Sequence, residues 1–153
     1  MKDHVIIVSA CLLGIPCRYD GRQKAVRHII LLAEHNTIVP VCPEQLGGLS
    51  TPRQPSEICG GTGVDVVNNN AKVVSQSGAD VTANFLQGAR QALHIARLVH
   101  ADTAVFKERS PSCGVYSLRK QGEKVGGCGV TAAMFFAEGI RVLSDEDLLP
   151  DQV

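Results

Sequence analysis

A short apolar run near the start of the chain limits the possible folds most strongly. Residues 5–10 (V-I-I-V-S-A) are continuous, largely β-branched and too few for a core helix, so they predict a β-strand that is buried on both faces. The run leads directly into residues 11–17 (C-L-L-G-I-P-C), where Gly14 and Pro16 interrupt regular structure. Strands buried on both faces are typical of parallel sheets that helices cover.

The rest of the chain predicts strands that alternate with helices. Further strands are expected at residues 37–42, 103–106 and 140–143, and helices at residues 24–35, 80–99 and 130–138. Pro40 cannot donate a backbone hydrogen bond, so the strand at 37–42 is expected at a sheet edge. We therefore predict an α/β fold, a single domain over residues 1–153 with a mostly parallel, Rossmann-like sheet flanked by helices.

Three segments depart from this alternation. Residues 43–63 are rich in proline and glycine and predict a long loop, which in a compact domain is usually functional or disordered. Residues 64–67 and 71–74 flank three asparagines and predict a small hairpin. The acidic residues 144–153 predict a peripheral tail.

Composition excludes several classes of protein. The chain has 15 Lys+Arg and 15 Asp+Glu, so it lacks the basic surplus of a nucleic-acid coat, and we expect no stable nucleic-acid complex. Aromatic residues make up only 4%, too few for a base-stacking platform. No apolar run approaches the ~20 residues that span a bilayer, so no membrane partner is expected. The first four residues lack the charge pattern of a signal peptide, and the expected location is cytoplasmic.

Three of the six cysteines occupy corresponding positions. Cys11 follows the first predicted strand, Cys42 ends the second, and Cys113 lies a few residues beyond the third. Because ligands in parallel α/β sheets bind beyond the carboxyl ends of the strands, these thiols are expected to meet at one rim. Three thiolates suit a soft centre, namely zinc, copper(I) or an iron–sulfur cluster.

The residues around these thiols favour a cluster over zinc. No histidine lies beside the three loops, and the chain contains no Cys-x-x-Cys pair, whereas structural zinc usually takes such ligands. A cluster held by only three thiolates would leave one iron open to act as a Lewis acid on a substrate. The alternative is that all three are buried apolar side chains, as free cysteine often is.

Several sequence strings resemble the thiouracil desulfidase family. They are S-A-C-L-L-G-I-P-C-R-Y-D-G at 9–21, V-C-P-E-Q-L-G-G-L at 41–49, T-P-R-Q-P-S-E-I at 51–58, K-E-R-S-P-S-C-G at 107–114 and G-V-T-A-A at 129–133. The resemblance covers roughly residues 5–143. It implies an enzyme that replaces C=S by C=O in a thiouracil-type nucleobase or nucleoside and releases sulfide.

The resemblance also implies the site residues. A 4Fe-4S cluster would be held by Cys11, Cys42 and Cys113, with the fourth iron free. Glu44 would be the acid/base residue, although it could instead cap its loop or pair with Arg53. A serine of the Ser110-Pro111-Ser112 string would assist, and Ser110 is the expected one.

Two other functions stay open at this point. The same thiols could form a non-catalytic metal- or sulfide-binding module, or Cys113 could be the nucleophile of a metal-free sulfurtransferase. Cys17 is expected to be a pocket wall or a packed thiol, although a role as fourth ligand would close the reactive position. Cys59 and Cys128 are expected to be incidental. The sequence does not indicate an oligomeric state.

Overall fold

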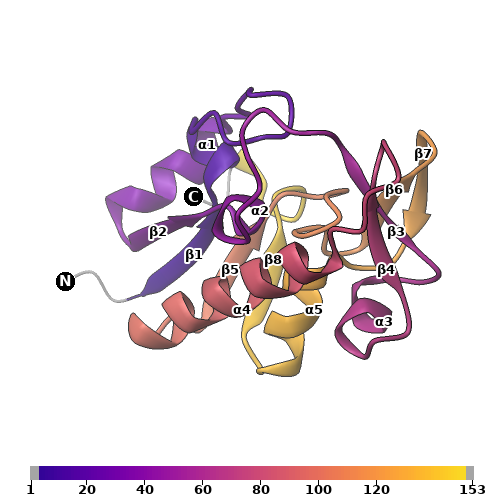
Figure 1. Cartoon of the computed structure of the whole chain (residues 1–153). Coiled ribbons are helices and arrows are strands. Elements are labelled where there is room, and N and C mark those ends of the chain that lie inside the picture. Colours follow the sequence, from indigo (N-terminus) through magenta and orange to yellow (C-terminus); the bar gives the residue numbers. More distant parts are fainter. Residues whose placement is uncertain (1–3, 151–153) are drawn as a thin grey trace.

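The computed structural model describes residues 4–150 and contains a four-stranded parallel sheet (Figure 1). Its strands are β1 (Val5–Ser9), β2 (Thr37–Val41), β5 (Thr103–Phe106) and β8 (Arg141–Ser144), in the order β2-β1-β5-β8. The predicted α/β class and parallel sheet are confirmed. The strand that contains Pro40 is at an edge, as the missing backbone donor predicted.

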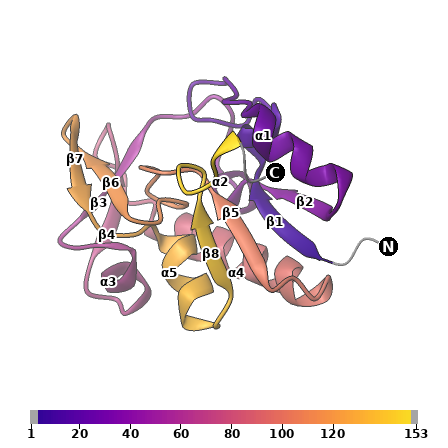
Figure 2. The same cartoon turned by 180° about the vertical axis from the view of Figure 1, so that it is seen from behind.

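Helices cover both faces of this sheet (Figures 1 and 2). On one face, α4 (Thr82–Leu98) and α5 (Val130–Ala137) bury Ile7, Ala104 and Phe106, and the Phe106 ring meets Phe135 edge-on with centroids 5.0 Å apart. On the other face, the short helices η1 (Ala10–Leu13), α1 (Arg27–Ile30) and η2 (Leu31–Glu34) cover neighbouring strand residues. This alternation along β1 gives the sheet an apolar core on each side.

Two hairpin-like sheets and a short helix form the other end of the molecule (Figure 1). Strand β3 (Ser56–Cys59) pairs with β4 (Lys72–Ser75), and β6 (Ser117–Lys120) pairs with β7 (Glu123–Gly126), both antiparallel. The helix is α3 (Gly63–Val67). Their apolar residues share a cluster with Phe85 of α4 and Val130 of α5, so this end is continuous with the main core.

The predicted hairpin at residues 64–67 and 71–74 is wrong. Residues 63–67 form α3 because Thr62 and Asp65 make a capping box, in which the Asp65 carboxylate accepts a hydrogen bond from the Thr62 amide at 2.7 Å. The later run does form a strand, β4, but its partner is β3. Residues 43–63 are therefore not one long loop, since they contain β3 and the short helix α2 (Pro43–Leu46).

Two further expectations need correction. The helix predicted at 24–35 begins only at Arg27 and consists of one α-helical turn followed by a 3₁₀ turn. The tail is not peripheral at its start, because Ser144 is fully buried and Asp145 accepts a hydrogen bond from the Glu108 amide at 2.7 Å. The ends of the chain that entered the signal-peptide and tail predictions, residues 1–3 and 151–153, lie outside the described residues.

Helix α2 packs unusually closely on α4. A Cβ atom at Gly88 would collide with the Pro43 carbonyl, and one at Gly47 would collide with the Asn84 carbonyl. The Asn84 amide also donates to the Gly47 carbonyl at 2.8 Å. Because α2 directly follows Cys42, this contact fixes the position of the segment that carries Glu44. Within residues 4–150, no helix is long and apolar enough to cross a bilayer.

Candidate metal centre and active site

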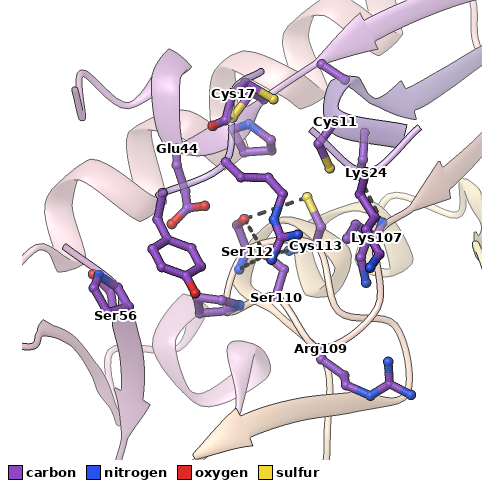
Figure 3. Close-up of a pocket in the computed structure, with 18 of the residues that line it drawn as sticks. Cys11, Cys17, Lys24, Glu44, Ser56, Lys107, Arg109, Ser110, Ser112 and Cys113 are labelled. Atoms are coloured by element: carbon purple, nitrogen blue, oxygen red, sulfur yellow. Dashed lines mark hydrogen bonds between the residues drawn. The ribbon is translucent and has the colours of Figure 1, made fainter. Parts of the chain in front are cut away.

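A cavity of about 380 Å³ opens at the carboxyl ends of β1, β2 and β5. Its wall contains Cys11 of η1, Cys42 after β2 and Cys113 in the loop after β5. From β1 the chain continues to β2 on one side of the sheet, and from β5 it continues to β8 on the other side. Open α/β sheets usually bind ligands at the point between two such strands, beyond their carboxyl ends. Figure 3 shows Cys11 and Cys113 extending toward one another on the side of the cavity across from Glu44.

The pKa values of Cys17, Cys42 and Cys113 in this wall are raised, which favours the protonated thiols when no metal is bound. Burial raises the pKa of Cys113 to about 12. A hydrogen bond with Cys11 is the main cause that raises the pKa of Cys17 to about 11, and a hydrogen bond with Cys17 raises the pKa of Cys42. Metal binding at these sulfurs would therefore release protons.

The spacing of the donors argues against a single metal ion. Among residues 4–150, no three His, Cys, Asp or Glu side chains lie close enough together to hold one ion. In a 4Fe-4S cluster each thiolate binds a different iron atom, so its ligands lie farther apart. Three soft donors from three strand ends around one cavity fit such a cluster. Cys17 is a further, buried thiol in the same wall.

The loop after β5 brings two serines to the cavity. The Ser110 hydroxyl accepts hydrogen bonds from the amides of Ser112 and Cys113 at 3.2 and 3.1 Å, and it contacts the Ser112 hydroxyl at 3.0 Å. The Ser112 hydroxyl is buried and donates to the Cys113 sulfur at 3.6 Å. Ser110 is half-buried. The two serines therefore differ in position, because Ser112 contacts the thiol and Ser110 is the more accessible.

Glu108 organises this loop and was not singled out from the sequence. Its Oε1 atom accepts hydrogen bonds from the amides of Val115, Tyr116 and Ser117, each at 2.9 Å. Burial opposes ionisation, but these amides and the nearby Ser144 hydroxyl outweigh it and lower the pKa of Glu108. The Ser144 hydroxyl does not complete a hydrogen bond to Oε2, which is buried and has no partner among the described residues.

Glu44 forms an ion pair inside the cavity wall. Its Oε2 atom lies 3.1 Å from Arg53 Nη2, and both side chains are largely buried. Burial raises the pKa of Glu44, and the Arg53 guanidinium partly offsets that effect. The pairing with Arg53 that the sequence offered as an alternative to catalysis is present, and Glu44 nevertheless lines the cavity.

The remaining wall includes one aromatic and several basic side chains. Tyr19 is the one aromatic side chain among its described residues, and Lys24, Lys107 and Arg109 are basic residues of the same wall. Cys59 is exposed at the end of β3, and Cys128 is partly buried before α5. Neither belongs to the cavity wall that the structure describes.

Comparison with known proteins identifies the family. The 2-thiouracil desulfurase family model matches residues 6–147. An uncharacterized protein of Bacillus subtilis (strain 168), YbbK, is 47% identical over 147 residues, which are 94% of this chain and 97% of that protein. A solved structure of a [4Fe-4S]-dependent thiouracil desulfidase, TudS, is 40% identical with a TM-score of 0.84, over 95% of this chain and 93% of TudS.

These matches extend over nearly all of the chain and agree with the α/β architecture described above. They confirm the resemblance that the cysteine-containing strings indicated. The chain belongs to the 2-thiouracil desulfurase family.

Proposed function

We propose that this protein is a 4Fe-4S-dependent desulfidase that removes sulfur from a thiouracil-type nucleobase or nucleoside. The overall reaction replaces C=S by C=O, consumes one water and releases hydrogen sulfide, so it needs no oxidant or reductant. The observation that carries the proposal is the single cavity lined by Cys11, Cys42 and Cys113 in a member of this family. The 40% identity to TudS, a [4Fe-4S]-dependent enzyme, supports the same cofactor.

The three thiols are the proposed protein ligands of the cluster. Bound through three of its irons, the cluster would supply a fourth, open iron whose soft Lewis acidity suits the sulfur of a thiocarbonyl and makes the adjacent ring carbon easier for water to attack. Cys17 is assigned to the wall, next to Cys11 and Cys42, and not to the ligand set.

Glu44 is the proposed acid/base residue. Glu44 lines the cavity, and its contact with Arg53 is made by Oε2, which leaves Oε1 for other partners. That oxygen can accept a proton from a water molecule in the cavity, which makes the water a better nucleophile. The same carboxyl can then deliver the proton to the departing sulfur or the ring.

Ser110 is the proposed assisting serine. Its hydroxyl oxygen is held by two amides of its own loop, so the position of the group is defined, and its proton, which faces the Ser112 hydroxyl, can turn to a water or substrate. A donor at this place can orient the attacking water or bind the pyrimidine ring. Ser112 is better suited to hydrogen-bond the Cys113 sulfur, where it would stabilise a ligating thiolate.

A metal-free mechanism with Cys113 as nucleophile is less well supported. Nucleophilic attack requires a thiolate, and without a metal the pKa of Cys113 is about 12, which leaves almost none of it ionised at neutral pH. Reactive cysteines usually have a pKa below the ordinary value, so the environment of Cys113 favours metal ligation.

Anaerobic sulfide release tests the proposed function. The protein is reconstituted with iron and sulfide, and then assayed with 2-thiouracil, 4-thiouracil and the corresponding thiouridines beside the cluster-free protein. The proposal predicts stoichiometric sulfide and oxo-pyrimidine only with the loaded protein. Equal activity of the cluster-free protein would favour the cysteine nucleophile, and a loaded protein that releases no sulfide from any of these compounds would contradict an enzymatic role.

A further inference from the structure

Arg53 lies in the irregular segment between α2 and β3, and its side chain contacts several parts of the cavity wall. Its side chain is only 6% exposed. Nη2 lies 3.1 Å from Glu44 Oε2, donates to the Cys17 carbonyl at 2.9 Å, and lies 4.0 Å from the Cys42 sulfur. One guanidinium nitrogen therefore touches the proposed acid/base residue, a proposed ligand and the loop that follows Cys11.

The other contacts of Arg53 fix the guanidinium itself. Nη1 donates to the Ser50 carbonyl at 3.2 Å and to the Thr51 hydroxyl at 3.1 Å. The Arg53 amide donates to the Tyr19 carbonyl at 2.8 Å. The side chain is thus anchored at its own segment, while its backbone and Nη2 together hold residues 17–19.

We propose that Arg53 is a positioning residue that fixes the direction of the Glu44 carboxylate relative to the thiol wall. The inference rests on the proposed function, because it assigns Arg53 a part in the same reaction. By holding Oε2, the guanidinium leaves Oε1 as the oxygen that can contact water or substrate. A carboxylate without this contact would rotate, and small misplacements of a reacting group can cost about a hundredfold in rate.

A purely structural role explains these contacts less well. Buried ion pairs are often no more stabilising than apolar residues of similar volume, because both charges lose their hydration. Here Arg53 Nε is also buried without an acceptor among the described residues, which costs further stability. The arrangement is therefore poor as a device for stability and well suited to orient a charged group.

Arginine is also the residue type that this position needs. Its planar fork presents several donors in fixed directions, so it can bind Glu44, the Cys17 carbonyl and its own segment simultaneously. A lysine could keep the charge near Glu44 but would not reproduce these directions. Arg53→Lys therefore separates orientation from charge, and Arg53→Met removes both.

Steady-state kinetics of the cluster-loaded variants test the proposal. We expect Arg53→Met to lower kcat about 100-fold and Arg53→Lys about tenfold, with KM within about threefold of wild type and with unchanged iron content. Arg97→Lys and Arg97→Met are matched controls, because Arg97 pairs with Glu138 at 2.7 Å outside the cavity wall. Both controls should keep wild-type kcat.

A double-mutant cycle gives a readout that does not depend on turnover. The unfolding temperatures of loaded wild type, Arg53→Met, Glu44→Gln and the double variant are compared, and the two substitutions should be non-additive because the side chains are in contact. Additive shifts, a wild-type kcat in Arg53→Met, or loss of iron in proportion to kcat would overturn the positioning role. Lack of sulfide release by wild type itself would instead overturn the proposed function.

Discussion

At the scale of single residues, the cavity wall separates side chains suited to hold a cofactor from side chains suited to move protons. The thiols of Cys11, Cys42 and Cys113 are soft donors. Glu44 and Ser110 can accept or donate protons and lie in the same wall. Substitutions in the two groups should therefore affect different measurements.

Serine substitutions at the thiols test the first group. Cys11→Ser, Cys42→Ser and Cys113→Ser should each reduce bound iron well below about four atoms per chain, because an alcohol is a poor replacement for a thiolate ligand. The measurement is iron and acid-labile sulfide per chain after anaerobic reconstitution. Cys59→Ser is the control, since Cys59 is exposed and outside the wall, and it should bind a full cluster. Full iron in any of the three test variants would remove that residue from the ligand set.

Removing the charge of Glu44 tests the second group. Glu44→Gln should lower kcat by about 10²–10⁴-fold, the usual contribution of general acid–base catalysis, with the cluster retained. The measurement combines sulfide release with the visible absorption of the cluster. Glu138→Gln, which alters the exposed partner of Arg97, serves as the control. A Glu44→Gln enzyme with near-wild-type kcat would show that the residue only pairs with Arg53.

Residues of the site differed in how far the sequence could predict them. The convergence of the thiols could be predicted from the strands that they follow, whereas Glu44 and the serines were proposed from the family resemblance of their strings. Arg53 was recognised only as a possible partner of Glu44, since its contacts with Cys17 and Ser50 depend on how three separate segments fold together. Glu108 was missed because its hydrogen-bond donors are backbone amides, and these leave no pattern of side-chain types in the sequence.

At the scale of elements, the contact between α2 and α4 determines where Glu44 lies. Gly88→Ala would place a methyl group against the Pro43 carbonyl, so α2 would have to move. We expect a loss of about 1–3 kcal/mol in unfolding free energy, as for other overpacked sites, together with a lower kcat. The measurements are denaturant unfolding and sulfide release. Wild-type activity in Gly88→Ala would refute the link.

Glu108 predicts a pH-dependent stability for the loop after β5. Since the folded pKa of Glu108 is lowered, its ionised form stabilises the fold above the ordinary value near 4.5, and this contribution is lost as the pH falls through the folded pKa. Glu108→Gln should therefore cost about 1–3 kcal/mol at pH 7, typical of hydrogen bonds to a charged group. The difference from wild type in chemical unfolding should shrink below pH 4.5, and a constant difference would contradict the assignment.

The elements that could not be predicted share a physical cause. The parallel strands are short, largely β-branched apolar runs that the sequence displays, so they were predicted nearly to their ends. Residues 64–67 are equally apolar and β-branched, but the capping box at Thr62 and Asp65 and packing of Val66 in the core favour a helix. The β6–β7 hairpin is mostly polar and buries Ser117 and Leu118 but not the rest of its residues, so its own pattern is a weak signal for a strand.

At the scale of the whole molecule, parallel topology brings distant residues to one place. Cys11, Cys42 and Cys113 are far apart in the chain and meet at one cavity because each follows a strand of the same sheet. This convergence could be predicted from the sequence, since it follows from the common direction of the strands. The exact ligand spacing could not, because it depends on the packing of η1, α2 and the loop after β5.

Mössbauer spectroscopy of protein loaded with iron-57 tests most directly whether three thiols hold a cluster with one open iron. The account predicts four irons per chain, of which one differs from the other three and changes its isomer shift or quadrupole splitting when thiouracil is added, but not when uracil is added. Four irons with full protein ligation and no response to thiouracil, or iron that does not form a four-iron cluster, would contradict it.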